Sequence, residues 1–132
     1  MSDGMTPKDA LGAAKAALLS VVPASSLLYE GAAMADGARK YGAYNYRGKK
    51  AKASVYVDAC LRHLLAWYDG EENAADSGLP HLAHAKACLG ILIDTKETGN
   101  LIDDRPPTGT AAALLERFRK TESVTSPGLD EK

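Results

Sequence analysis

Two central segments of the chain repeat apolar residues every three or four positions, which is the spacing of one face of an α-helix. The first covers residues 55–69, with Ser54 as its expected N-cap, and the second covers residues 80–97, between Pro80 and Gly99. Because a polar turn of about ten residues joins the two segments, we expect antiparallel neighbouring helices.

Weaker patterns predict the rest of the fold. Thr6, Pro7 and Asp9 suit the start of a helix over residues 7–20, and Pro23 separates it from a second helix over residues 25–40. A last amphipathic helix is predicted over residues 110–120. Residues 41–52 and 100–109 lack this period and are predicted to be connections, and no alternating β-branched run indicates a strand. The expected fold class is all-α, a small bundle of about five helices in one domain, residues 1–120, with residues 121–132 as a flexible tail.

The composition is that of an ordinary globular protein and excludes several classes. Of 132 residues, 45% are hydrophobic and 25% are charged, which excludes collagen-like and wholly disordered chains. A net charge of -1 excludes the bulk positive charge that binds duplex DNA without sequence preference. No run approaches the ~18 apolar residues of a membrane span. Cys60 and Cys88 stand inside helical patterns, so we expect a cytoplasmic protein with reduced thiols. A modest core of Leu and Ala favours burial between subunits, hence a homo-oligomer.

All three histidines of the chain flank the turn between the two central helices. His81 and His84 lie three positions apart on one helix, and His63 lies on the other. The turn adds three acids: Glu71, Glu72 and Asp76. Carboxylates, with or without imidazole, can hold a hard divalent cation such as Mg²⁺ or Mn²⁺. An equally weighted interpretation is an acidic surface turn whose histidines form local hydrogen bonds.

Asp58 and Arg62 lie four residues apart on the helix that leads into this turn. One interpretation is a surface ion pair, which stabilises a helix by about a few tenths of a kcal/mol. The other places Asp58 among metal ligands, because paired helices with inward carboxylates form metal sites in bundles.

Residues 39–52 contain six basic residues and no acid. The basic residues are Arg39, Lys40, Arg47, Lys49, Lys50 and Lys52. Among them stand Tyr41, Tyr44, Asn45 and Tyr46, which offer π-faces for a nucleobase and an amide that can read a base edge. A solvated basic loop, or a patch against another subunit, would have the same composition. A nucleoside triphosphate with bound metal suits both this segment and the acidic turn, so the chemistry inferred is hydrolysis of a phosphoanhydride.

Several blocks of the sequence, which follow one another in the family's order, resemble the phage dATP/dGTP diphosphohydrolase family. Within that family the resemblance is to the MazZ type, a MazG-like (d)GTP pyrophosphohydrolase. These blocks are GARKYG at residues 37–42, NYR at 45–47, RHL at 62–64, GE at 70–71 and DSGLPHLAH at 76–84. MazG-like enzymes are all-α, form dimers or tetramers, and cleave a nucleoside triphosphate between the α and β phosphates. The resemblance implies metal-dependent release of (d)GMP and pyrophosphate from (d)GTP, with dATP as another candidate substrate. In a phage-infected host cytoplasm, the dGMP would supply the synthesis of 2-aminoadenine nucleotides.

The matching blocks imply roles for individual residues. The expected catalytic acids are Glu71, Asp76 and Asp58. The expected ligands of Mg²⁺ or Mn²⁺ are Glu71, Glu72, Asp76, Asp58 and His81. The expected substrate-binding residues are Arg39, Lys40, Tyr44, Asn45, Tyr46, Arg47, Lys49, Arg62, His63 and His84. The usual ExxE and ExxD metal motifs of the superfamily are absent from this sequence.

Two other classes of protein remain open at this level. A non-catalytic accessory protein would use residues 39–52 to bind single-stranded nucleic acid in a salt-sensitive manner and without metal. A structural bundle would instead bring the acidic turn and the basic segment together across a subunit interface. For the enzyme we expect no stable complex with nucleic acid and no membrane association.

Overall fold

The computed structural model describes residues 4–119, which form six helices and two short strands. The elements are α1 (Pro7–Gly12), α2 (Ala24–Tyr41), α3 (Asn45–Gly48), β1 (Ala51–Lys52), α4 (Ala53–Tyr68), α5 (His81–Glu97), β2 (Leu101–Ile102) and α6 (Ala111–Arg117). The predicted all-α class is confirmed, because each strand has only two residues. The predicted tail, residues 121–132, lies outside the described residues.

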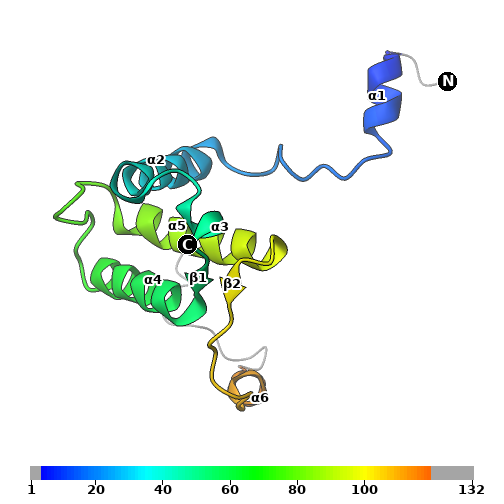
Figure 1. Ribbon diagram of the computed structural model, residues 1–132. Helices are drawn as coiled ribbons and strands as arrows, with labels where there is room; N and C mark the ends of the chain where they lie inside the picture. The colour runs from blue at the N-terminus through cyan, green and yellow to red at the C-terminus, as the bar shows by residue number, and fades with distance from the viewer. Residues whose placement is uncertain (1–3, 120–132) are drawn as a thin grey trace.

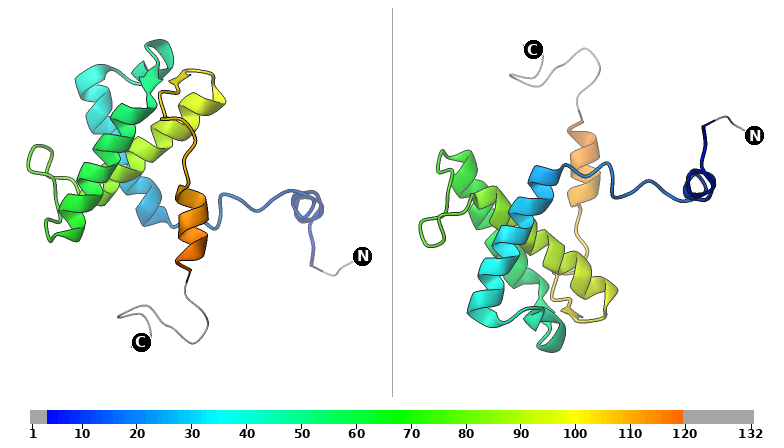
Figure 2. Two further views of the ribbon diagram at one scale, coloured as in Figure 1. Left: turned by 90° about the horizontal axis from the view of Figure 1, so that it is seen from below. Right: turned by 90° about the horizontal axis from the view of Figure 1, so that it is seen from above.

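The centre of the fold is the pair α4 and α5, and α5 also packs against α2 (Figures 1 and 2). β1 directly precedes α4, β2 follows α5, and the strands pair in parallel, Ala51 with Leu101 and Lys52 with Ile102. The start of α4 therefore lies beside the end of α5, which confirms the predicted antiparallel arrangement. Both helices also match their predicted ranges closely, and α5 is followed by Gly99 at φ 75°.

Small side chains allow α2 and α5 to approach each other closely. Ala33, Ala83 and Ala87 are buried together, with Met34 packed against them. At Gly90 of α5, an added Cβ would lie only 2.5 Å from the Glu30 Oε2 atom of α2. This close packing fixes the position of α2, and with it the side chains that α2 presents to α4 and α5.

Large apolar side chains lie mostly at the surface of this chain. Among the described residues, the buried apolar positions are alanines and Cys60. On α4, Val57, Leu61, Leu64 and Tyr68 recur at helical spacing, yet they are 41%, 50%, 38% and 86% exposed. The amphipathic stripe that predicts this helix is therefore not covered by the chain's own core.

The first predicted helix is wrong in length, because α1 ends at Gly12 and not at residue 20. Its start is as expected: Thr6 Oγ1 accepts the Asp9 N–H at 3.0 Å, and the Asp9 carboxylate accepts the Thr6 N–H at 2.9 Å. No residue of α1 is buried, and the helix lies away from the other elements (Figure 1). Without a packed face, a capped helix start does not sustain further turns.

The two predicted connections contain structure that the sequence pattern did not indicate. Residues 41–52 hold α3 and β1, and residues 100–109 hold β2. The predicted N-cap of α4 is also wrong, since Lys52 occupies that position and Ser54 lies in the first turn. The Ser54 N–H donates to Asp104 Oδ1 at 2.8 Å, and the Ser54 hydroxyl donates to Asp104 Oδ2. A strand of two residues is too short to show a hydrophobic period, and Asp104 lies 50 residues from Ser54 in the sequence. Local sequence patterns therefore could not indicate either feature.

The cysteines agree with the expected reduced thiols. Cys60 is buried in α4 and Cys88 is half-buried in α5, and both are free. Burial raises the pKa of the Cys88 thiol to about 11, so this thiol is protonated at neutral pH. Among the described helices, none has both the length and the apolar character required to cross a membrane.

Candidate active site

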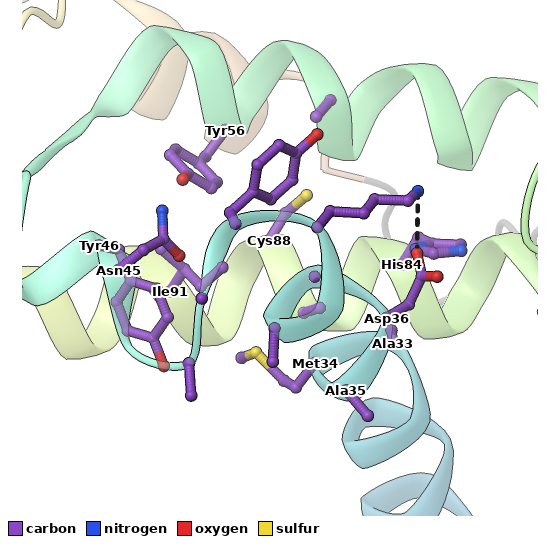
Figure 3. A pocket seen from close by; sticks show the side chains of 18 of the residues that line it. Ala33, Met34, Ala35, Asp36, Asn45, Tyr46, Tyr56, His84, Cys88 and Ile91 are labelled. Atoms are coloured by element: carbon purple, nitrogen blue, oxygen red, sulfur yellow. Dashed lines mark ion pairs between the residues drawn. The ribbon is translucent and has the colours of Figure 1, made fainter.

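A cavity of about 900 Å³ lies between α2, α3, α4 and α5 (Figure 3). Tyr46, Asn45 and Tyr56 gather at one end, and Asp36 and His84 lie at the other. Pockets for small ligands commonly measure about 300–1,000 Å³, so this cavity can hold a molecule of nucleotide size. Its two ends differ in chemistry, one aromatic and one charged.

At the charged end, Lys40 joins two carboxylates. Its Nζ atom lies 3.0 Å from Asp36 Oδ2, the pair marked by a dashed line in Figure 3, and 3.5 Å from Asp76 Oδ2. The hydrogen bond with Asp36 raises the pKa of Lys40. The same hydrogen bond lowers the pKa of Asp36, and the positive charge of Lys40 lowers that of Asp76. All three groups are therefore ionised at neutral pH.

Asp36 is absent from the predicted site, although it is only 8% exposed and holds two basic side chains. Arg39 Nη2 donates to Asp36 Oδ1 at 3.0 Å, and Lys40 occupies the other oxygen. Asp36 precedes Arg39 by three positions and Lys40 by four on the same helix. These are the spacings at which helix side chains meet, so the sequence itself contains a signal for both ion pairs. Arg39 is consequently bound to Asp36 and does not line the cavity.

The aromatic end of the cavity is built on the turn between α2 and α3. Tyr44 has φ 57°, a left-handed conformation that few non-glycine residues adopt, and its ring centre lies 5.9 Å from that of Tyr46. Burial raises the pKa of the Tyr46 and Tyr56 hydroxyls, so both stay protonated. Tyrosine faces stack on flat rings, and the Asn45 amide donates and accepts hydrogen bonds. This end suits an aromatic ring with a polar edge.

Arg47 anchors this turn and does not face the cavity. Its Nε and Nη2 atoms donate to the two carboxylate oxygens of Asp94 on α5, at 2.9 and 2.8 Å. The same guanidinium lies 4.7 Å from the centre of the Tyr44 ring, within reach of a cation–π contact. The hydrogen bond from Arg47 lowers the pKa of Asp94. Arg47 thus ties α3 to α5.

The three histidines are in contact where α4, α5 and the intervening turn meet. His63 Nδ1 lies 2.8 Å from His81 Nδ1, and His81 Nε2 lies 2.6 Å from Glu71 Oε1. His84 stacks on His63, with ring centres 4.8 Å apart, and its Nε2 lies 2.7 Å from Ser77 Oγ. Desolvation, together with His84 and His81, lowers the pKa of His63 and favours its neutral form.

Backbone hydrogen bonds fix the turn that carries the acids. Asn73 and Pro80 pair as a β-bridge, and the His81 N–H donates to the Glu72 carbonyl at 2.9 Å. Gly78 supplies the positive φ of 74° that the turn requires. The turn is therefore a defined platform, which brings Glu71 within hydrogen-bonding distance of His81 on the next helix.

The structure brings together about half of the predicted site. Lining the cavity are Lys40, Tyr44, Asn45, Tyr46, Arg62, His63, Asp76 and His84. Outside its lining are Arg39, Arg47, Lys49, Asp58, Glu71, Glu72 and His81. Of the latter, Glu71 and His81 connect to the cavity wall through His63. The predicted pair of Asp58 and Arg62 does not occur among the ion pairs of residues 4–119.

The five predicted metal ligands are not gathered at one point. Within the described residues, no group of three His, Cys, Asp or Glu side chains is arranged to hold a metal ion. Asp58 is exposed on α4, and Glu71 and His81 are bonded to each other. The acids that line the cavity are Asp36 and Asp76.

Cys88 and Tyr56 are among the other lining residues that the predicted site lacks, although helical spacing relates both to predicted residues. Cys88 follows His84 by four positions on α5, and Tyr56 precedes His63 by seven positions on α4. These intervals place each pair on one helix face. Counting whole helical turns from the histidines would therefore have identified Cys88 and Tyr56 from the sequence.

Fold and cavity define a small all-α domain whose pocket combines tyrosines and an amide with cationic and acidic side chains. A family model described as dATP/dGTP diphosphohydrolase, N-terminal, matches residues 5–105. The chain belongs to this family, whose name indicates a hydrolase of the diphosphohydrolase type. Comparisons with curated proteins and with solved structures give no match.

Proposed function

We propose that this protein hydrolyses (d)GTP, and dATP as a further substrate, between the α and β phosphates to the monophosphate and pyrophosphate. The observation that carries the proposal is that one cavity has both an aromatic, amide-bearing end and a charged end (Figure 3). A purine suits the first end and a triphosphate the second. Family membership supports a purine deoxynucleotide as the substrate.

The cationic side chains of the cavity suit the phosphates. Arg62 lines the cavity and forms no ion pair within residues 4–119, so its guanidinium is available to phosphate oxygens. Lys40 is held at the same cavity by Asp36 and Asp76. Positive charges fixed before the substrate arrives stabilise the negative charge that develops on the phosphates during cleavage.

The two carboxylates at the charged end of the cavity suit a divalent cation. Mg²⁺ commonly takes only one or two carboxylates and completes its shell with substrate phosphates and water. Asp36 and Asp76 are two carboxylates that already share one cation, the ammonium of Lys40. We propose these two acids as the protein ligands of Mg²⁺ or Mn²⁺, in place of the five-residue set expected from the sequence. When bound, the metal would neutralise phosphate charge.

The exposed stripe of α4 supports a homo-oligomer, a dimer or a tetramer. Leu61 lies in the middle of this stripe and is 50% exposed. A stripe of apolar side chains on one helix is more stable when a second subunit covers it. Leu61→Glu should lower the mass measured by light scattering, whereas Leu115→Glu on α6, where the side chain is 73% exposed, should not. An unchanged mass for Leu61→Glu would contradict this interface.

The function is tested by incubating the purified protein with each common NTP and dNTP, with and without Mg²⁺ or Mn²⁺. Ion-exchange chromatography should show metal-dependent formation of a monophosphate and pyrophosphate, fastest with guanine nucleotides. Lys40→Ala should lose at least tenfold in kcat/KM, and Lys96→Ala, which removes an exposed lysine from the end of α5, should retain full activity.

The absence of hydrolysis with every nucleotide, combined with salt-sensitive oligonucleotide binding, would favour the single-strand accessory protein. In the structure Arg39, Lys40 and Arg47 are already bound to carboxylates, which weakens that alternative. As an extension of the proposal, the dGMP released would supply 2-aminoadenine nucleotide synthesis in the cytoplasm of a phage-infected host.

A further inference from the structure

The turn and the two central helices form a continuous chain of hydrogen bonds that ends at the cavity. Glu71 Oε1 lies 2.6 Å from His81 Nε2, and His81 Nδ1 lies 2.8 Å from His63 Nδ1. His81 is 6% exposed, whereas the Glu71 side chain is 62% exposed, so the chain runs from the surface through a buried ring. His63 is the member that lines the cavity.

The order of donors and acceptors follows from the carboxylate at one end. An ionised Glu71 only accepts, so the Nε2 atom of His81 carries a hydrogen and donates it. A neutral His81 then has an unprotonated Nδ1, which accepts from the Nδ1–H of His63. The remaining nitrogen of a neutral His63, its Nε2, is consequently unprotonated.

This Nε2 atom is also accessible. Among the described residues, His63 Nε2 has no hydrogen-bond partner. Every fully buried side-chain nitrogen or oxygen of these residues has a partner, so Nε2 is not fully buried. The ring itself cannot rotate freely, because its Nδ1 is bonded to His81 and its face is stacked on His84 at 4.8 Å. A fixed imidazole with an open lone pair at a cavity wall is suited to accept a proton.

We propose that His63 Nε2 is the proton acceptor for the hydrolytic water, and that His81 and Glu71 are positioning residues that hold His63 in this tautomer. The inference rests on the proposed function. The water loses a proton to His63 Nε2, and its oxygen bonds to the α-phosphorus. The bond from the α-phosphorus to the α,β-bridging oxygen breaks, and pyrophosphate leaves with the electron pair.

The carboxylate has a second effect once the proton has been transferred. When His63 is protonated, its Nδ1–H donates to His81 Nδ1. The Nε2–H of His81 in turn donates to the Glu71 carboxylate. A negative charge at the end of this chain stabilises the protonated ring. The depressed pKa of His63 keeps the resting ring neutral and ready to accept. Desolvation, His84, His81 and Arg62 oppose the protonated form, and Asp76 favours it.

The tautomers are tested first, without any substrate. With only three histidines in the chain, long-range ¹H–¹⁵N spectra at neutral pH can be assigned by single substitutions. We expect a protonated Nδ1 and an unprotonated Nε2 for His63, and the reverse for His81. A protonated Nε2 on His63 in the wild-type protein would overturn the proposal, whatever the activity of the enzyme.

Kinetics supply the second test. His63→Gln should lower kcat by about 100-fold or more while KM changes little. Glu71→Gln should lower kcat by at least tenfold and make the His63 spectrum a mixture of tautomers, and its exposed side chain makes this variant safe for folding. Asp69→Asn, an exposed acid two residues earlier, is the matched control and should do neither.

The two levels of inference fail differently. If the wild-type protein hydrolyses nucleotides and His63→Gln keeps full kcat, the proton acceptor is wrong while the proposed function stands. If no nucleotide is hydrolysed under any condition, the proposed function fails and the catalytic role of His63 fails with it, even where the spectra show the expected tautomers.

Discussion

Replacing Ala83 by Leu tests whether close packing of α2 on α5 holds the candidate site together. Ala83 is 2% exposed and lies with Ala33 and Ala87 at the contact between these helices. The buried Ala83 methyl group packs among these alanines, so the larger isobutyl group of leucine would overfill the contact. Overpacking of this kind costs about 1–3 kcal/mol.

The measurement is thermal unfolding followed by circular dichroism at one fixed protein concentration, because oligomerisation makes the melting temperature depend on concentration. For a domain of about 100 residues, each kcal/mol lowers the melting temperature by about 4–8 °C, so a fall of roughly 4–24 °C is expected. Ala112→Leu, on the exposed helix α6, is the matched control and should leave the melting temperature unchanged.

The same variant has a functional consequence. Displacement of α2 moves Lys40 and Asp36 away from the charged end of the cavity, so nucleotide binding should weaken together with stability. An Ala83→Leu protein with the wild-type melting temperature would refute the close packing of α2 and α5. Unaltered nucleotide affinity in a destabilised variant would show that α2 does not position the site.

Three further predictions concern single interactions. Asp104→Ala should lower the melting temperature by removing the acceptor for the Ser54 N–H and hydroxyl at the start of α4, and a wild-type value would contradict this cap. Asp94→Ala should release Arg47 and α3, and so raise KM for the nucleotide with little change in kcat; an unchanged KM would show that α3 needs no anchor. Because the folded protein lowers the pKa of His63 below 6.5, the unfolded chain binds the extra proton first, and this residue makes stability fall as pH falls through 6.5 to the folded pKa. Denaturant unfolding between pH 5 and pH 7 should show a shallower slope for His63→Gln than for the wild-type protein, and identical slopes would exclude this contribution.

Local patterns in the sequence are sufficient for the helices that have them. The period of residues 80–97, with Pro80 before it and Gly99 after it, predicts α5 closely, because helix boundaries depend on residues within one turn of the end. The basic tyrosine-rich segment and the histidine-bearing turn are also evident from the sequence, and both contribute to one cavity. Their chemistry follows from side-chain type alone.

The pairing of these side chains depends on tertiary structure. Lys40 meets Asp76, Arg47 meets Asp94, and His63 meets His81 only because α2, α4 and α5 pack in one particular arrangement. The family resemblance and the basic composition of residues 39–52 predict Arg47 as a substrate-binding residue, and only the fold shows that its guanidinium binds Asp94 on α5.

The apolar face of α4 shows most clearly what local sequence determines and what tertiary structure decides. The sequence determines that Val57, Leu61, Leu64 and Tyr68 share one face, since the helical period is local, and that face remains exposed in the single chain. Which face of an amphipathic helix is covered, and by what, is decided by the packing of distant segments, because the hydrophobic effect is non-directional and does not select a partner.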